Sequence, residues 1–526
     1  MSIRLLVFSV LLVLVPLATS DSSLDKFLQC LPSHSDYSYP ISEAIYRTTN
    51  SSFEPTLRAY AKASRFLTPA TSKPVAIVAA IHESHVQATV ICARSNGLQI
   101  RIRSGGHDYE GLSYVSDVPF VILDTFNLRS IDIDVAEKTA WIQSGATTGE
   151  LYYNIANKSN VLAFPAGVCF TLGAGGHFSG GGYGNLMRKY GLSIDNIVDA
   201  KLVDVNGKIL DRKSMGEDLF WAIRGGGGAS FGVILSWKIN LVDVPPKVTT
   251  FTVYKTLEQG AADVVYRWQE VASKLDKELF IRVMQEVVNG SSGSNKTVRV
   301  SFIGLFLGPS SKLLPLMKIS FPELGLQQKD CNEMSWVEST LYWFGFPNGT
   351  SIETLLSRPT QSSFFKRKSD YVKRVIPKEC LEKIWKTMIK VERVWMQWNP
   401  YGGRMDEIPA TATAFPHRAG NLFKIQYSVD WSDQEGIEAA NHHMDLITQL
   451  FDEMTPYVSS NPREAFLNYR DVDIGSNPSN ETSFEKAEVY GCKLFKGNFI
   501  RLVKVKSRVD PDNFFKYEQS IPPSLK

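Results

Sequence analysis

The stretch RSGGHDYEGLSY, from Arg103 to Tyr114, follows the run LQIRI (98–102), in which apolar and polar residues alternate. Such alternation is typical of a β-strand. Two glycines and a histidine therefore stand where the expected strand ends, and the glycines remove side-chain bulk from the approach to His107. This pattern indicates a loop that brings bare backbone and one imidazole up to a ligand.

Two further glycine clusters follow in the same part of the chain. Residues 173–184 contain seven glycines, and Gly225 to Gly228 are consecutive. Neither the dinucleotide-binding pattern G-x-G-x-x-G nor the P-loop pattern occurs in these clusters, so both of those standard phosphate sites are excluded. Backbone N–H groups in concave loops can still cradle a pyrophosphate. Three clusters in one module favour such a surface over ordinary turns.

The length and the pattern of the chain predict two domains. Its 526 residues exceed the ~300 over which one core usually extends. From about Pro69 to Val244, strand-like and helix-like runs alternate in an α+β pattern, with strands expected at 75–80, 98–103 and 120–124, a helix at 82–96, and a hairpin at 199–211 with a tight primed turn at Asn206-Gly207.

A change of composition after Val244-Pro245-Pro246 indicates the second domain. The glycine clusters stop there, and strand-like runs such as 251–256 and 298–308 alternate with helical ones. Near the C-terminus, a helix-like run from Phe484 to Val505 is expected to pack back on the first domain.

The net charge and the N-terminal residues indicate which kinds of partner and which location to expect. The net charge is only +3 and no long run of one sign occurs, which argues against nucleic-acid binding and favours a small-molecule partner. Residues 1–20 resemble a cleaved secretion signal, with Arg4 before an apolar run that is too short to span a membrane. We therefore expect a secreted protein without a membrane anchor.

Secretion would expose the chain to glycosylation and to oxidation. Cys30 and Cys92 could pair in a disulfide in such a compartment. His82 and His85 lack the i, i+4 spacing of zinc proteases, and no metal is predicted. Six sequons are available, at Asn50, Asn157, Asn289, Asn295, Asn348 and Asn480.

A hydrolase interpretation is weak. Residues 228–232, GASFG, match the G-x-S-x-G pattern of serine hydrolases, but that pattern needs a helix directly after the serine. Here the strand-like run VILSWKINLV (233–242) follows. We therefore do not expect Ser230 to act as a nucleophile.

Five motifs together resemble the plant berberine bridge enzyme-like flavoproteins, and the match extends from about Cys30 to Pro522. They are RSGGHDYEG, PAGVCFTLGAGGHFSGGGYG, YGLSIDNIVDAKLVDVNGKILD, DLFWAIRGGGGASFGVI and NYRDVDIG. The resemblance implies an α+β fold with a vanillyl-alcohol-oxidase-type (PCMH-type) FAD domain at 21–244, whose core covers about 69–244. A substrate domain at 245–460, an antiparallel sheet covered by helices, and a C-terminal segment at 461–526 that returns to the FAD domain would follow.

The same resemblance implies FAD bound through two covalent bonds. His107 would hold the 8-methyl carbon of the flavin and Cys169 its ring carbon 6. Other residues implied to contact the cofactor are Arg103, Ser104, Gly105, Gly106, Leu172, Gly175, Gly176, His177, Gly181, Gly182, Asn185, Asp195, Val198 and Asn468.

The substrate side of the expected site lies on the strand FKIQYSVDW (423–431), where alternation puts Lys424 and Gln426 on one face. The resemblance implies that this strand covers the flavin and that Tyr109, Tyr183 and Tyr469 share the pocket. A cationic Lys424 near a phenol would lower the pKa of that phenol, which makes Tyr183 the expected catalytic base.

Two positions restrict the type of reaction that the resemblance implies. The enzyme that names the family has a glutamate base where this chain has Gln426, which cannot take up a proton, so alkaloid ring closure is disfavoured. Relatives that react well with oxygen resemble one another in having valine where this chain has Leu172, which favours a dehydrogenase.

The resemblance thus predicts oxidation of monolignol-type allylic alcohols to aldehydes in the apoplast or cell wall, or in the vacuole, with an unidentified electron acceptor. Alternatives are oxidation of the anomeric carbon of an oligosaccharide, oxidative cyclisation of a specialised metabolite, and a flavin-binding protein without turnover.

Overall fold

The computed structural model describes residues 18–290, 295–432 and 435–524. Residues 1–17, most of the expected signal peptide, lie outside them. The first described element is α1 (Ala18–His34), and the disulfide Cys30–Cys92 joins it to α3 (Glu83–Ser95). The pairing of these two cysteines that the sequence suggested is confirmed.

The first sheet of the N-terminal module has the strand order β1-β2-β4-β3, with β2 and β3 parallel to β4. Helix α3 connects β2 to β3, and the His82 imidazole caps its first turn by accepting a hydrogen bond from the Ser84 N–H. The elements predicted at 75–124 are confirmed. The strands are β1 (Ile45–Arg47), β2 (Ala76–Ala79), β3 (Gln99–Arg103) and β4 (Phe120–Asp124).

The second sheet is antiparallel and has the order β5-β6-β10-β8-β9. Strand β10 directly follows the GASFG stretch, as expected, so no hydrolase-type helix starts there. The strands are β5 (Ile131–Asp134), β6 (Thr139–Gln143), β8 (Ile197–Val203), β9 (Ile209–Leu210) and β10 (Val233–Asn240). Helices of this module are α2 (Phe53–Arg58), α4 (Thr148–Lys158), α5 (Ala174–Ser179), α6 (Met187–Tyr190) and α7 (Arg212–Ile223).

The turn between β8 and β9 differs from the prediction of a two-residue primed turn. The last paired residues are Val203 and Ile209, so the connection has five residues, and only Gly207 in it has a positive φ. Asp204 Oδ1 accepts hydrogen bonds from the N–H groups of Asn206 and Lys208. This side-chain turn stabilises a longer loop, which is why the Asn-Gly pair does not form the tighter one.

The third sheet has seven antiparallel strands in the order β15-β12-β14-β13-β17-β18-β16. A small pair, β7 (Leu162–Ala163) with β11 (Val242–Asp243), precedes it in the N-terminal module. The strands predicted at 251–256, 298–308 and 423–431 all belong to the large sheet. Its strands are β12 (Val248–Thr256), β13 (Leu279–Asn289), β14 (Lys296–Phe306), β15 (Cys331–Met334), β16 (Phe364–Val372), β17 (Trp395–Pro400) and β18 (Phe423–Trp431).

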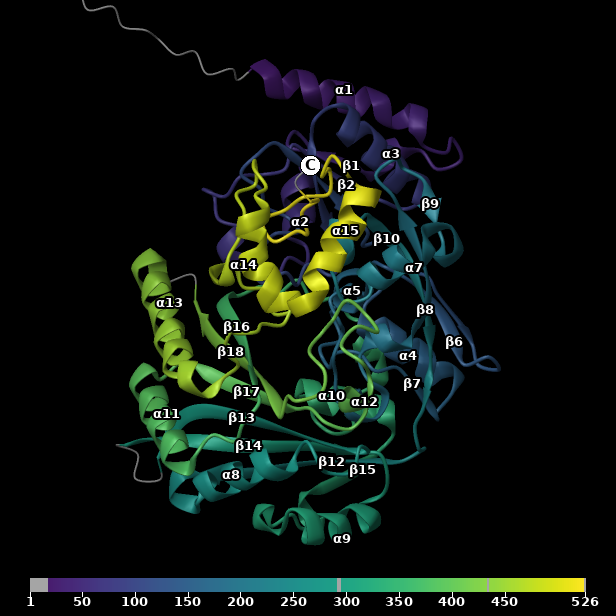
Figure 1. Cartoon of the computed structure of the whole chain (residues 1–526). Coiled ribbons are helices and arrows are strands. Elements are labelled where there is room, and N and C mark those ends of the chain that lie inside the picture. The colour runs from purple at the N-terminus through teal and green to yellow at the C-terminus, as the bar shows by residue number, and fades with distance from the viewer. Residues whose placement is uncertain (1–17, 291–294, 433–434, 525–526) are drawn as a thin grey trace, which may run out of the picture.

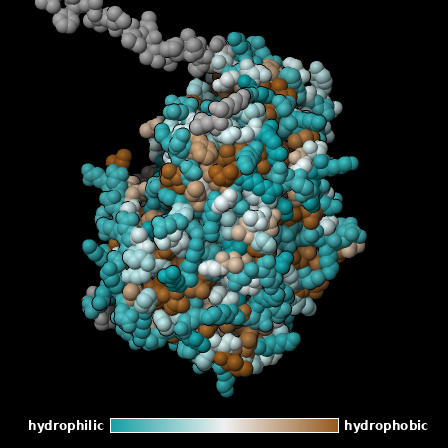
Figure 2. Space-filling model, in the orientation of Figure 1, coloured by the Kyte–Doolittle hydropathy of each residue, from teal (hydrophilic) through white to brown (hydrophobic). Residues whose placement is uncertain are grey.

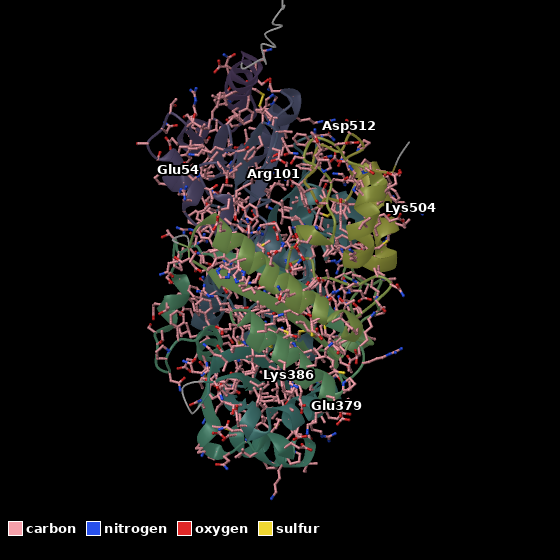
Figure 3. All side chains as sticks on the ribbon, turned by 90° about the vertical axis from the view of Figure 1, so that its left-hand side faces the viewer. Glu54, Arg101, Glu379, Lys386, Lys504 and Asp512 are labelled. Carbon is pink, nitrogen blue, oxygen red and sulfur yellow. A yellow bond between two sulfur atoms is a disulfide. The ribbon has the colours of Figure 1, made fainter. Side chains whose placement is uncertain are left out.

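Helices cover the outer face of this sheet (Figure 1). Helix α11 shows why: Ile384 and Trp385 are buried in a core shared with the strands, while Glu379 and Lys386 point to solvent (Figure 3). The covering helices are α8 (Ala261–Val271), α11 (Lys378–Val391) and α13 (Gly436–Glu453), and α9 (Ser310–Ser320), α10 (Trp336–Phe344) and α12 (Arg404–Glu407) lie at the sheet's ends and connections. These helices do not cover the opposite face of the sheet.

The C-terminal segment returns to the N-terminal module, where α15 packs on α7 (Figure 1). The single helix expected over 484–505 is two helices, α14 (Phe484–Phe495) and α15 (Phe499–Val509), with Lys496 at a φ of 50° between them. The break lets the Phe499 ring lie directly on Gly491, where a methyl group would clash with it.

The visible surface is mostly hydrophilic, with hydrophobic residues in small patches (Figure 2). Within residues 18–290, 295–432 and 435–524, no helix combines the length and apolar character that crossing a membrane requires. All six sequon asparagines are exposed.

Candidate active site

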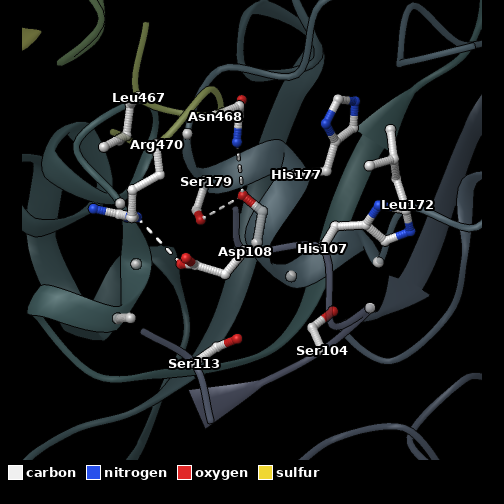
Figure 4. A pocket seen from close by; sticks show the side chains of 18 of the residues that line it. Ser104, His107, Asp108, Ser113, Leu172, His177, Ser179, Leu467, Asn468 and Arg470 are labelled. Carbon is white, nitrogen blue, oxygen red and sulfur yellow. Dashed lines mark hydrogen bonds and ion pairs between the residues drawn. The ribbon is translucent and has the colours of Figure 1, made fainter. Parts of the chain in front are cut away.

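A cavity of about 400 Å³ lies where the two sheets of the N-terminal module, the large sheet and the C-terminal segment meet. The glycine clusters form one part of its wall, and the uncovered face of the large sheet forms another. Figure 4 shows lining side chains from both ends of the chain, among them His107, Leu172, His177 and Asn468.

The loop after β3 needs its glycines. A Cβ on Gly105 would lie 2.3 Å from the Gly173 nitrogen, and one on Gly106, at a φ of +67°, would lie 2.4 Å from the Tyr60 carbonyl oxygen. Backbone therefore packs on backbone at both positions. The Ser104 hydroxyl donates to the Ser144 carbonyl at 2.6 Å and fixes the start of the loop.

One hydroxyl joins the two expected flavin attachment residues. His107 Nε2 lies 2.9 Å from Thr171 Oγ1, and Cys169 Sγ lies 3.4 Å from the same oxygen. Both residues line the cavity. The imidazole and the thiol, 62 positions apart in sequence, are thus placed to act on one ligand, and His107 Nδ1 has no hydrogen-bond partner among the described residues.

The surroundings favour an uncharged histidine. Burial, with a contribution from the Lys62 ammonium, lowers the pKa of His107 to about 3. A neutral imidazole keeps the lone pair that a nucleophile needs. Burial raises the pKa of the Cys169 thiol, while Thr171 and Lys62 act in the opposite direction. Lys62 is held beside them by the carbonyl oxygens of Pro359 and Gln361, at 2.6 and 3.0 Å.

The opposite wall presents hydroxyl and amide groups. The Tyr183 and Tyr469 hydroxyls are hydrogen-bonded to each other, and Gln397 Nε2 donates to the Tyr183 oxygen at 3.0 Å. Gln426 Nε2 donates to the Tyr109 oxygen at 3.0 Å. Gln397 and Gln426 are register partners on β17 and β18, so sheet pairing sets both amides side by side.

The three tyrosines differ in their surroundings. Burial raises the pKa of Tyr109 and raises that of Tyr469 well above its usual value. The Tyr183 oxygen has two partners, the Gln397 amide and the Tyr469 hydroxyl, whereas the Tyr109 oxygen has the Gln426 amide alone. Tyr183 thus has the most hydrogen bonds at its oxygen among the three.

Two protein families match the chain, one in the N-terminal module and one in the C-terminal segment. Residues 74–212 match the family described as FAD binding domain, and residues 465–522 match the one described as Berberine and berberine like. Berberine bridge enzyme-like 17 from Arabidopsis thaliana is 59% identical over 522 residues, covering 98% of each chain. The chain belongs to the berberine bridge enzyme-like family.

Solved structures of this family have the same fold. BBE-like #28 from Arabidopsis thaliana has a TM-score of 0.89 at 44% identity, covering 95% of this chain and 100% of its own. Phl p 4, a grass pollen allergen with glucose dehydrogenase activity, gives 0.89 at 42% over the same shares. The berberine bridge enzyme of Eschscholzia californica gives 0.88 at 36%, covering 95% and 99%. The α+β, PCMH-type fold is thus confirmed, and the chain is an FAD-binding member of an oxidoreductase family.

The cavity fits FAD by its own chemistry. Glycines from all three clusters line it, so the phosphate-cradle hypothesis agrees with the structure. Ten of the residues expected at the cofactor lie on its wall: Ser104, Gly105, Gly106, His107, Cys169, Leu172, Gly175, Gly176, His177 and Asn468.

Six other expected cofactor residues lie outside the wall. Arg103 is fully buried behind it, where it pairs with Asp124 and donates to backbone carbonyls of α2. Asp195 pairs with Arg418 and accepts from the Leu192 N–H. Gly181, Gly182, Asn185 and Val198 also lie outside the residues that line the cavity. Contact of these six residues with the cofactor stays a prediction.

Lys424 also differs from expectation. Its ammonium nitrogen lies behind the wall, 3.2 Å from the centre of the Tyr183 ring and 3.7 Å from that of Phe466. Burial lowers its pKa well below the usual value. Lys424 thus contacts the face of the Tyr183 ring, and the Tyr183 oxygen receives its hydrogen bond from Gln397. The action of Lys424 on the Tyr183 pKa stays a prediction. Tyr109, Tyr183, Tyr469 and Gln426 lie on the wall as expected.

Several residues at the site were missed from the sequence. Thr171, which contacts both His107 and Cys169, stands two residues after Cys169, but a lone threonine carries no signal. Gln397 comes from β17, where strand pairing sets it opposite Gln426, and Arg282 comes from β13 and also lines the cavity. Arg470 and Tyr517 reach the cavity from the C-terminal segment.

Proposed function

We propose that this protein carries FAD bonded to both His107 and Cys169 and oxidises an alcohol carbon of a small molecule. The observation that carries the proposal is the shared wall: the Thr171-linked imidazole and thiol lie in the same cavity as three tyrosine hydroxyls. The bound flavin would supply the hydride acceptor.

The chain's own residues would bind the substrate and move its proton. Tyr183 would take the proton of the substrate hydroxyl at its phenolic oxygen, with Gln397 stabilising the charge that forms there. Tyr109, held by Gln426, and Tyr469 would orient the substrate. Gln426 has no proton-accepting group, which supports alcohol oxidation over ring closure.

Monolignol-type allylic alcohols are the proposed substrates, because aromatic side chains dominate this end of the cavity, where Phe466 and the tyrosines line it. A carbohydrate is the second candidate. Phl p 4, at 42% identity, is a glucose dehydrogenase, and aromatic walls also pack on sugar rings.

A substrate screen without oxygen tests the proposal. Coniferyl-type alcohols should bleach the flavin absorbance, and Tyr183→Phe should slow bleaching at least ~100-fold while the substrate dissociation constant changes little. Bleaching by oligosaccharides alone would favour the second candidate. If neither class bleaches the flavin, the protein is a flavin-binding protein without this activity.

The covalent attachment has its own test. After acid precipitation the yellow chromophore should stay with the protein. His107→Ala and Cys169→Ala should each retain it through the remaining bond, and only the double variant should release FAD. Release from the unsubstituted protein would show that FAD is not covalently bound.

We propose further that the protein is secreted to the apoplast. Six exposed sequon asparagines and the Cys30–Cys92 disulfide support this location. Treatment of the plant protein with an N-glycosidase should lower its apparent mass, and an unchanged mass would contradict secretion through this route.

A further inference from the structure

A cluster of charges lies beside the tyrosine wall, and all of its members except Asp473 are buried. Lys366 and Lys368 point to the same face of β16, and they are 1% and 4% exposed. We call them, together with Glu110, Asp471 and Asp473, the lysine cluster. None of its five members lines the cavity.

The two lysines join two distant segments of the chain. Lys366 Nζ lies 2.7 Å from Glu110 Oε1 and 2.7 Å from Asp471 Oδ1. Lys368 Nζ lies 3.1 Å from Asp471 Oδ2 and 2.5 Å from Asp473 Oδ2. One strand of the substrate domain thus fixes the loop after His107 and the C-terminal segment at once.

Each of these two segments carries a tyrosine of the wall. Tyr109 directly precedes Glu110, and Tyr469 stands two residues before Asp471. The two rings lie 5.9 Å apart, centre to centre. Arg470 Nε lies 3.2 Å from Asp108 Oδ2 and links the same two segments again.

The charges inside the cluster depend on one another. Burial raises the pKa of Glu110 against the effects of Lys366 and of Arg65, which also pairs with it. Burial alone would raise the pKa of Asp473, but Lys366 and Lys368 lower it to about 2. Buried ion pairs seldom stabilise a fold more than apolar packing would, so stability alone does not account for this cluster.

We propose that Lys366 and Lys368 are positioning residues, which set the distance between Tyr109 and Tyr469 and so shape the substrate side of the cavity. The functional part of this inference rests on the proposed role of the tyrosines. Charged hydrogen bonds act here as fixed spacers between three segments that lie far apart in the sequence.

Hydrogen exchange tests the positioning without any substrate. In Lys366→Met, the amides of Glu110, Gly111, Tyr469 and Asp473 should exchange about tenfold faster, because their turns lose the anchor. Asp370→Asn is the matched control: Asp370 is a buried charge on the same strand, paired with Arg463, and touches no cavity tyrosine. It should leave these amides unchanged.

The rate of flavin reduction tests whether this positioning matters for the reaction, when Lys366→Met is combined with changes of the two tyrosines. Lys366→Met should lower the limiting rate of flavin reduction ~100-fold, the cost of a displacement of about 1 Å, with little change in substrate affinity. Lys366→Arg should restore most of the rate. In the double variant Tyr109→Phe/Tyr469→Phe, Lys366→Met should have no further effect, because the groups that it positions are gone.

Unchanged exchange of the four amides in Lys366→Met would overturn the proposal, whether or not a substrate is found. Equal rate losses with and without the two tyrosine hydroxyls would also overturn it, because the lysine would then act on the whole fold. If Lys366→Met does not fold, Asp473→Asn, whose side chain is 44% exposed, should give the same local pattern more weakly.

Discussion

At the scale of single residues, Lys424 combines an ionisable group with an almost wholly aromatic environment. Its nitrogen lies over the rings of Tyr183, Phe466 and Tyr469 and makes no hydrogen bond with a described residue. Attraction to the ring faces favours the ammonium form, while burial favours the free amine. Burial, with a contribution from the Arg282 guanidinium, lowers the pKa of Lys424 well below 10.5.

This lowered pKa makes stability depend on pH. Between the folded-state pKa and 10.5, the unfolded chain holds one more proton than the folded chain, so stability rises with pH. Lys424→Met removes that penalty and should stabilise the protein most at acid pH, with the gain vanishing above pH 10.5. Denaturant unfolding at pH 5.5 and 9 measures this, with the exposed Lys386→Met as control. A larger gain at pH 9 would contradict the burial argument.

Leu172 offers a second prediction at this scale. It lines the cavity, and a Cβ on Gly167 would lie 2.6 Å from its Cδ1. In Phl p 4 the wild type is a glucose dehydrogenase and an isoleucine-to-valine variant is a glucose oxidase. If Leu172 restricts oxygen in the same way, Leu172→Val should speed reoxidation by oxygen at least ~10-fold without changing reduction by substrate.

Stopped-flow mixing of the reduced protein with oxygenated buffer decides the role of Leu172. Equal rates for parent and variant would assign it to packing alone, where loss of one methylene costs roughly 1 kcal/mol. If the unsubstituted protein already reoxidises fast with oxygen, it would be an oxidase and not the predicted dehydrogenase.

At the scale of elements, the close contact between two loops depends on glycine. Gly105 follows β3 and Gly173 precedes α5, and neither has room for a Cβ. Gly105→Ala must push apart the loops that carry His107 and Cys169. We expect it to cost about 1–3 kcal/mol and to reduce the flavin bound per protein.

The matched control for this change is Gly497→Ala, because Gly497 is exposed and has open space around it. Flavin absorbance relative to protein absorbance measures the occupancy, and thermal unfolding measures the stability. Full flavin content in Gly105→Ala would show that the two loops are not held together by this contact.

The same elements show where local sequence signals succeed. Periodicity alone placed β18, because nine residues of one strand carry a clear alternation. It failed at the β8–β9 turn, where the Asp204 side chain overrides the Asn-Gly preference, and between α14 and α15, where packing of Phe499 on Gly491 breaks a continuous helical pattern. In each failure, a side-chain contact outweighed backbone propensity.

At the scale of the whole molecule, the site is assembled from segments that no local pattern connects. The Tyr183–Tyr469 contact spans 286 positions and the Gln426–Tyr109 contact spans 317. Composition and periodicity predicted two domains and the glycine loops, whereas the assignment of His107 and Cys169 to one cofactor and the tyrosine set came from the family resemblance. The lysine cluster, Gln397 and Arg282 needed the three-dimensional register.

The C-terminal segment packs on the N-terminal module, and one ion pair with a buried arginine lies in that contact. Arg101, on β3 and 1% exposed, forms two hydrogen bonds with Glu518, at 2.7 and 2.9 Å. A second pair between the same regions, Arg94 with Asp512, lies in solvent, with Asp512 at the surface in Figure 3. Both pairs join the α3–β3 region to the residues that follow α15, and they differ in how deeply they are buried.

Glu518→Gln should therefore destabilise the protein by about 3–5 kcal/mol, because it leaves the Arg101 charge buried without a counter-ion. Asp512→Asn should change stability by less than about 1 kcal/mol, since water already screens that pair. Replacing both Arg101 and Glu518 by methionine should recover part of the loss, because no unpaired charge then remains. Denaturant unfolding of the four proteins measures these differences. Equal effects of Glu518→Gln and Asp512→Asn would show that the tail is held by apolar contacts such as those of α15 on α7, and not by its buried charge.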